Sequence, residues 1–224
     1  LFIAAFIYLV LPKEVNYKKN TKIKKNKKII PFFSPKVWLM SGVIICAYCG
    51  FKSLDNITLY LHKGLGWSEI DAISFSSLIS YLRPIAAISF GIIVDKFSPS
   101  IIIIILFCVS VISNLFLSNL TPDISFTWIL FFNIFFVFIS IYALRGIYFS
   151  LLKQSKIPTN QTGIVVGIVS VIGYTPDIFF APLTGRLLDS APGIAGHQSY
   201  YFSIFIISIL GLLISLKLHK KLKN

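Results

Sequence analysis

The sequence predicts an all-α membrane protein, a bundle of six transmembrane helices preceded by the end of another helix. The 224 residues are 56% hydrophobic and 13% charged, with a mean hydropathy of +0.83. In soluble domains, about a quarter of all residues are charged. The apolar residues also gather in runs of roughly twenty, the length that a helix needs to cross about 30 Å of hydrocarbon. Both observations exclude a soluble globular domain.

The predicted elements are a partial helix, a basic loop, six spans and a basic tail. Residues 1–11 are apolar and predict the end of a preceding transmembrane helix. Residues 12–36 hold nine lysines and one acidic residue, Glu14, without apolar periodicity, which predicts a solvated loop. The bundle covers residues 37–217, and the tail covers 218–224. The predicted spans are 37–61, 70–94, 100–117, 125–152, 162–188 and 200–216.

The distribution of basic residues predicts the orientation of the bundle. Short connectors rich in turn-forming residues make each span antiparallel to the next. Sixteen of the 21 lysines and arginines then fall on one side, in the first loop, two connectors and the tail, while only Lys63 and Arg186 fall on the other. By the positive-inside rule, the long loop and the C-terminus are cytoplasmic.

The net charge of +13 does not indicate nucleic-acid binding, because the lysines lie beside a span, where they orient the helix and attract anionic lipid. We also expect no metal site and no cofactor. Cys46 and Cys49 lack the second pair or the histidines of a zinc site. The three histidines lie in connectors or the tail, and no catalytic spacing occurs at one depth. The sequence therefore does not predict an enzyme.

Ionisable residues within spans are costly, roughly 2.5 to 3.5 kcal/mol each on insertion scales, so each is a candidate functional residue. They occur on the first, second, fourth and fifth spans, whereas the third and sixth hold none. We therefore expect four spans to line a polar interior and two to pack outside. The candidate substrate-binding or coupling residues are Lys52, Asp55, Arg83, Arg145, Tyr148, Tyr174 and Asp177.

Each of these charges has a structural alternative. Lys52 and Asp55 are three residues apart and can neutralise each other instead of contacting a substrate or a proton. Arg145, flanked by tyrosines, suits a carboxylate or phosphate, but it also suits an ion pair that braces a gate.

The fifth span is the least regular. Gly173 and Pro176 predict a kink or unwound turn beside Tyr174 and Asp177. Transporters place binding groups at such breaks. Asp177 is therefore either a proton-coupling carboxylate or the partner of a basic residue, Lys52 or Arg83, and the ion pair is the slightly favoured alternative.

The connector GIIVDKFSPS resembles the G-x-L-x-D-[R/K]-x-G-[R/K] loop of major facilitator superfamily transporters, through Gly91, Asp95 and Lys96. It departs from that pattern at Ser98 and Pro99. The likeness extends over the whole chain, which has a basic central loop followed by six helices with this order of charges. The stretch ALRGIYFSLL is similar to the corresponding stretch in a bacterial branch of the family.

The resemblance implies that this chain is the C-terminal half of a twelve-helix transporter in a bacterial inner membrane. Gly91, Asp95 and Lys96 would form a conformational loop motif in which Asp95 pairs with an arginine, with Arg145 as the candidate. The implied partners are the lipid bilayer, an N-terminal six-helix half and a small solute, with proton or sodium coupling left open. The excess of buried bases over acids, three to two, favours an anionic solute. The alternative function is a structural or regulatory membrane subunit that does not transport.

Overall fold

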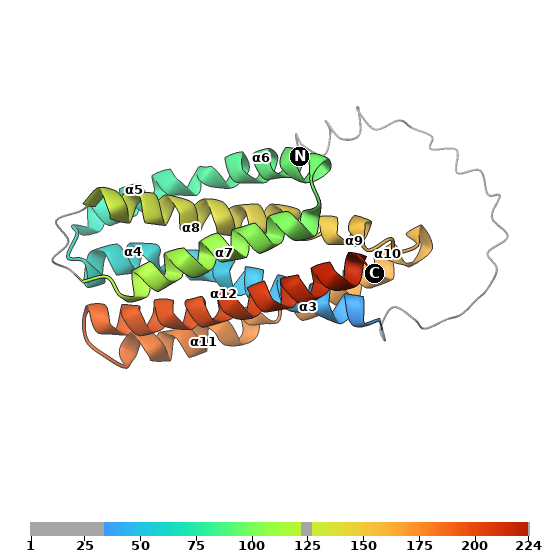
Figure 1. The fold of residues 1–224 in the computed structure, drawn as a ribbon. Coiled ribbons are helices and arrows are strands. Elements are labelled where there is room, and N and C mark those ends of the chain that lie inside the picture. The colour runs from blue at the N-terminus through green and yellow to red at the C-terminus, as the bar shows by residue number, and fades with distance from the viewer. Residues whose placement is uncertain (1–33, 122–126, 224) are drawn as a thin grey trace, which may run out of the picture.

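The computed structural model describes residues 34–121 and 127–223. Every regular element within them is helical (Figure 1). The expected helix end at 1–11, and the basic loop as far as residue 33, lie outside the described residues.

Six helical segments of the described chain are long and apolar enough to cross a membrane, which confirms the predicted all-α membrane bundle. The last segment is longer than expected, because the helix continues through most of the residues predicted as a tail. We call the segments the first to sixth spans: Pro35–Gly64, Glu69–Lys96, Pro99–Ser118, Trp128–Ile147, Asn160–Asp189 and Ile194–Lys223.

Three of the four spans that carry the candidate charges are interrupted: the first, the second and the fifth. The third and sixth are single helices, α7 (Pro99–Ser118) and α12 (Ile194–Lys223). The first comprises α3 (Pro35–Ser53), a 3₁₀ turn η1 (Leu54–Asn56), α4 (Ile57–Leu59) and a π turn η2 (Tyr60–Gly64). The second comprises α5 (Glu69–Ser80) and α6 (Leu82–Lys96), and the fifth comprises α10 (Thr159–Gly173) and α11 (Pro176–Asp189). The fourth, α8 (Thr127–Ile147), is followed by the short helix α9 (Ser150–Gln154).

Prolines account for two of these breaks. A proline has no N–H to donate to the carbonyl four residues earlier, and its ring clashes with that carbonyl. In the second span the residue four before Pro84 is Ser80, where α5 ends. In the fifth span the residue four before Pro176 is Ile172, and its carbonyl instead accepts a 2.7 Å hydrogen bond from the hydroxyl of Thr175. The expected break beside Tyr174 is therefore present, and the carbonyl to which the proline cannot donate is hydrogen-bonded by a side chain.

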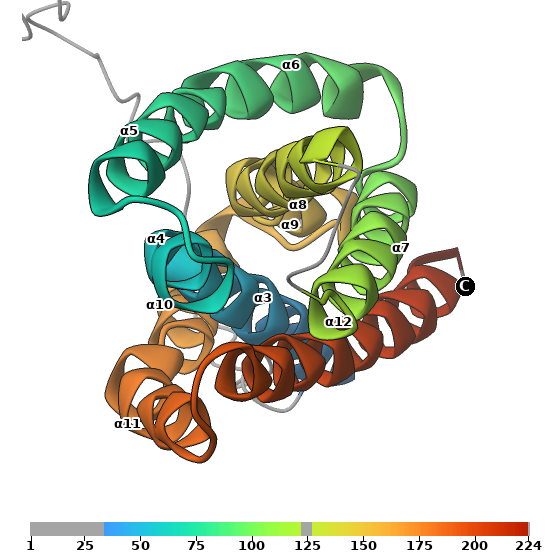
Figure 2. The same cartoon turned by 90° about the vertical axis from the view of Figure 1, so that its left-hand side faces the viewer.

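The first span lies at the centre of the bundle and contacts α8, α10 and α12 (Figure 2). The most extensive contact joins α7 to α12, and α6 packs on α8. We expected the third and sixth spans to pack outside. They do lie at one edge of the bundle, but 44% and 33% of their most apolar stretches are buried, against 17% and 28% for the second and fifth spans. The second and fifth spans are therefore the least covered.

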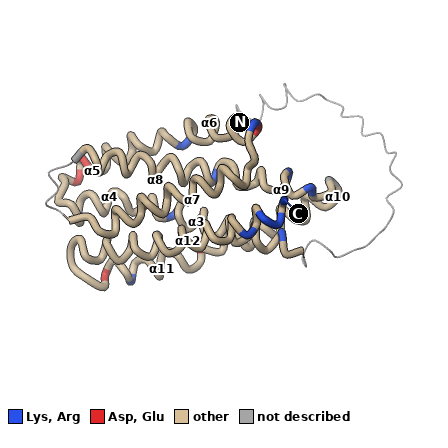
Figure 3. Tube along the Cα trace, in the orientation of Figure 1, with Lys and Arg blue, Asp and Glu red and all other residues tan. Residues whose placement is uncertain are grey.

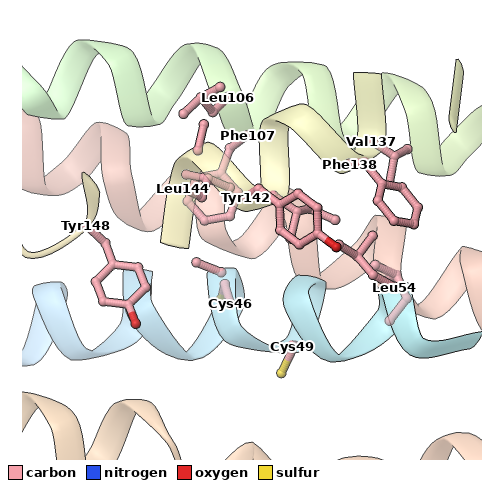
Figure 4. Packing of buried hydrophobic residues seen from close by; sticks show 14 of the residues in the cluster. Cys46, Cys49, Leu54, Leu106, Phe107, Val137, Phe138, Tyr142, Leu144 and Tyr148 are labelled. Carbon is pink, nitrogen blue, oxygen red and sulfur yellow. The ribbon is translucent and has the colours of Figure 1, made fainter. Parts of the chain in front are cut away.

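Two glycines explain why helices approach closely. A Cβ built on Gly211 of α12 would overlap the ring of Phe107 on α7 and would lie 2.9 Å from Cβ of Cys46 on α3. A Cβ on Gly146 of α8 would lie 3.2 Å from Cα of Ala87 on α6. Figure 4 shows buried side chains of α3, α7 and α8, including Cys46 and Phe107, between these helices. The packed core is thus centred on the first, third, fourth and sixth spans.

Candidate functional site

Charged residues within the bundle lie beside the helix breaks. Figure 3 shows lysine and arginine gathered at the end of the bundle where the C-terminus lies, with isolated basic positions along α3, α6 and α8. Lys52 precedes η1 by two residues, and Asp55 belongs to it. Arg83 follows the break in the second span, and Asp177 is the second residue of α11. Each break thus coincides with a charge.

Lys52 and Asp177 form an ion pair between the first and fifth spans. The ammonium nitrogen of Lys52 lies 2.8 Å from a carboxylate oxygen of Asp177. The Tyr48 hydroxyl, one helical turn before Lys52, donates to the same carboxylate at 2.9 and 3.0 Å from its two oxygens. The side chains of Lys52 and Asp177 are 32% and 47% exposed, so the described helices do not fully enclose the pair.

Tyrosines extend this network to the end of the fourth span. The ring of Tyr174, in the break of the fifth span, packs edge-on against Tyr48 at a centroid distance of 4.8 Å. Its hydroxyl lies 2.9 Å from the hydroxyl of Tyr148, in the turn between α8 and α9. A continuous polar and aromatic chain therefore joins three spans at their irregular points.

Both intramembrane arginines lie against one ring, that of Phe51. The guanidinium carbon of Arg145 is 3.6 Å from the Phe51 ring centroid, and that of Arg83 is 5.4 Å from it. Arg145 is also 5.5 Å from the Tyr48 ring centroid. Cations are attracted to the faces of aromatic rings within about 6 Å. Nη1 of Arg145 is buried and has no hydrogen-bond partner among the described residues.

A cavity of about 290 Å³ opens beside the ion pair, between the first and fifth spans. Lys52, Asp55 and Asp177 line it on the charged side. Small-molecule sites begin at about 300 Å³, so the space is of the size that a small solute needs. The remaining lining residues are Asn56, Pro176, Phe180, Ala181, Thr184, Gly185, Leu188 and Tyr200.

The structure brings most of the predicted site residues together. Lys52, Arg145, Tyr148, Tyr174 and Asp177 belong to one contiguous network, and Arg83 joins it through Phe51. Of the partners that the sequence left open for Asp177, the structure selects Lys52.

Two pairings that the sequence offered as candidates are not found among the described residues. Asp55 lines the cavity without an ion pair to Lys52, since the described residues contain only the Lys52–Asp177 pair. The expected pairing of Asp95 with Arg145 is also not found. Asp95 is exposed near the end of α6, and Arg145 stacks on Phe51 instead.

The connector 97–98 after α6 is fixed by hydrogen bonds of residues outside the loop motif and not by the charges of that motif. Gly91 and Lys96 of the loop motif make no side-chain hydrogen bond or ion pair to this connector in the described chain. Instead, Gln154 of α9 donates to the hydroxyls of Ser98 and Ser100 at 2.8 and 2.9 Å, and its carbonyl oxygen accepts from the Ser100 amide at 3.0 Å. The Ser100 hydroxyl lies 2.7 Å from Nδ1 of His219 on α12. We call these four residues the clasp.

Tyr48 and Phe51 are site residues that the candidate set did not include. Tyr48 was recognisable, because it shares a helical face with Lys52. Phe51 carried no signal, since one phenylalanine in an apolar span does not differ from the others before its neighbours are known. It became visible only when two guanidinium groups converged on its ring.

The fold and the site define a polytopic membrane protein with a cluster of charged residues among its helices. No family model matches the chain, and no solved structure matches it. The chain is 30% identical over 84 residues to "Inner membrane protein YihN" of Escherichia coli (strain K12), a match that covers 38% of this chain and 20% of the relative. It is 35% identical over 60 residues to "Inner membrane protein YqcE" of the same organism, covering 27% and 14%. From these shares, each relative is about twice as long as this chain.

Proposed function

We propose that this chain is the C-terminal half of a secondary transporter that moves a small solute across a bacterial inner membrane by alternating access. One observation carries the proposal: the network of Lys52, Asp177, Tyr48, Tyr174 and Tyr148 joins the first span, the end of the fourth span and the break of the fifth, beside a cavity of about 290 Å³. Broken helices with charges near the midplane are where transporters bind solutes and ions.

The network is better suited to a site that changes than to a fixed brace. A polar network that only braces a fold is rigid when all of its members are paired. Here the described helices do not fully enclose the Lys52–Asp177 pair, and Arg83 and Arg145 make no ion pair among the described residues. Ionisable residues within spans, which cost free energy to insert, typically mark solute or ion pathways.

The second and fifth spans supply the argument for a second half. They are the least covered of the six, and both present large apolar side chains, for example Leu78, Ile88 and Ile178. Another helical bundle would cover these faces, and the relatives named above are long enough to contain one. With the GIIVDK resemblance, these features support membership of the major facilitator superfamily, with the C-terminal end of α12 in the cytoplasm by the positive-inside rule.

Transport by the full-length gene product that contains this chain tests the proposal directly. The purified protein would be reconstituted into liposomes and offered a ¹³C-labelled metabolite extract from its source organism, with and without a proton or sodium gradient. We expect mass spectrometry to detect accumulation of one or a few small solutes. Empty liposomes and the Asp177→Asn variant are the controls. Lumenal contents identical to those of empty liposomes under every gradient would favour the structural or regulatory subunit.

A further inference from the structure

Of the three intramembrane bases of the described chain, Lys52, Arg83 and Arg145, only the two arginines make no ion pair. Lys52 and Asp177 neutralise each other at 2.8 Å. Arg83 and Arg145 each lie over the Phe51 ring, and neither makes an ion pair within residues 34–121 and 127–223. Two permanent positive charges therefore lie near the same ring with no counter-charge in contact.

The stacking geometry leaves the hydrogen-bonding groups of Arg145 available. A guanidinium that stacks on a ring uses its flat face, and its N–H groups point outward in its own plane. The Cζ of Arg145 lies 3.6 Å from the Phe51 centroid, which is a stacking distance, and its buried Nη1 has no partner. A buried donor without a partner costs free energy, so a site of this kind is completed by an acceptor.

We propose that Arg145 and Arg83 bind the oxyanion group of the transported solute, a carboxylate or a phosphoryl group, beside the Phe51 ring. The inference rests on the proposed function and names its substrate class, a small organic anion. The guanidinium fork matches both oxyanions, because each offers two oxygens to parallel N–H donors. The Lys52–Asp177 pair, which already balances its own charge, then serves the cavity beside it and does not hold the anion.

The geometry also explains why Arg83 lies farther from the ring than Arg145. Arg83 is exposed and follows the break before Pro84, whereas Arg145 is half-buried in α8. An anion held by Arg145 would recruit Arg83 across the Phe51 ring, which would draw the second span toward the fourth. Oxyanion binding would thus be coupled to movement at the break of the least covered span.

Binding can be measured separately from transport. The full-length protein in nanodiscs would be melted in increasing concentrations of inorganic phosphate, glycerol 3-phosphate or succinate, with glycerol and choline chloride as uncharged and cationic controls and ionic strength held constant with potassium chloride. The variants are Arg145→Ala, Arg145→Lys and Arg83→Ala. Arg186→Ala, an exposed arginine of α11 away from the Phe51 ring, is the matched control.

We expect at least one anion to raise the melting temperature of the wild type and of Arg186→Ala in a saturable manner. Arg145→Ala and Arg83→Ala should weaken that apparent affinity about tenfold or more, because hydrogen bonds to charged groups are lost. Arg145→Lys should fold normally and still bind more weakly, because lysine lacks the fork. Preference for succinate over both phosphates assigns a carboxylate, and the reverse assigns a phosphoryl group.

Three results would overturn the inference. The first is that no anion raises the melting temperature of the wild type, and the second is that the arginine variants bind the anion as tightly as the wild type. The third is that the arginine substitutions change the response to choline or glycerol instead of the response to the anions. Arginines that pair with acids of another bundle would give the first result. Because melting requires no translocation, anion binding without solute uptake would refute the proposed function while retaining the oxyanion site. Uptake of a neutral solute would retain the proposed function and refute the oxyanion site.

Discussion

The ammonium group of Lys52 and the carboxylate of Asp177 lie 2.8 Å apart, although one residue belongs to the first span and the other to the fifth. Both side chains remain partly exposed, at 32% and 47%. The described helices therefore do not fully enclose the pair. It joins the first and fifth spans beside their helix breaks, next to η1 and at the start of α11.

Neutralising one member of this pair should impair transport more than stability. Asp177→Asn keeps an acceptor for the Tyr48 hydroxyl but leaves the Lys52 ammonium without its counter-charge. We expect the initial uptake rate to fall about tenfold or more, a change in activation free energy of about 1.4 kcal/mol. Uptake is to be normalised to the amount of protein in the membrane.

The charge-neutral double variant separates the two roles of the pair. Lys52→Met with Asp177→Asn removes both charges, so the cost of an unpaired charge disappears while the switchable contact stays absent. If the double variant regains full uptake, the pair only balances charge and our interpretation is wrong. Lys63→Met, an exposed lysine at the end of the same span, is the control and should transport normally.

The hydrogen bond between Tyr148 and Tyr174 should couple the end of the fourth span to the break in the fifth. The two hydroxyls are 2.9 Å apart, and Tyr148 is buried. Tyr148→Phe and Tyr174→Phe should each lower the free energy of unfolding by about 0.5 to 1.5 kcal/mol. The double variant should cost less than the sum, as measured by reversible unfolding in mixed micelles. Additive losses would mean that the hydroxyls act independently, and Tyr81→Phe, 72% exposed, supplies the neutral control.

The sequence predicted the spans well because their signal is local. Apolar length is readable in one dimension, and each predicted span overlaps an observed segment. Proline is equally local, which is why the break beside Pro176 could be expected. Helix neighbours were harder to predict. The extensive contact of α7 with α12 depends on Gly211 and on the hydrogen bond between Ser110 and Ser208, small residues that apolar averages do not distinguish.

Pairings within the site were predictable only as alternatives. The sequence offered Lys52 and Arg83 as candidate partners of Asp177. Only the packing of α11 beside α3 selects Lys52. Asp55 was likewise left with two alternatives, a pair with Lys52 or contact with a substrate or a proton. Both side chains line the cavity, but the Lys52 ammonium lies against Asp177 of the fifth span. A contact from a distant span thus replaces the local one, which spacing along one helix does not reveal.

Close packing at Gly211 predicts a loss of stability on adding one methyl group. Gly211→Ala places Cβ against the Phe107 ring and Cys46, and overpacking of this kind costs about 1 to 3 kcal/mol. Thermal unfolding in detergent should show the loss, and Phe107→Leu should restore part of it by removing the ring. Gly167→Ala, where no atom lies within 4 Å of the added Cβ, is the matched control. Equal melting of both alanine variants would contradict the packing argument.

The clasp makes a prediction about a single amide. The first four N–H groups of a helix have no partner within that helix. Ser100 is the second residue of α7, and its amide donates to Gln154 of α9 at 3.0 Å, while the Ser98 side chain does not cap the helix. Gln154→Ala should therefore speed hydrogen exchange of the Ser100 amide about fivefold to tenfold, which corresponds to the loss of one hydrogen bond.

A matched glutamine at the opposite end of the bundle makes the test specific. Gln198 donates to the carbonyl of Leu120 at 2.8 Å and so fixes a different connector. Gln198→Ala should leave exchange at Ser100 unchanged. His219→Ala removes one partner of the Ser100 hydroxyl and leaves the partner of the Ser100 amide in place, so it should speed exchange less than Gln154→Ala. If Ser100 exchanges at the wild-type rate in Gln154→Ala, the connector after α6 is held by contacts other than the clasp.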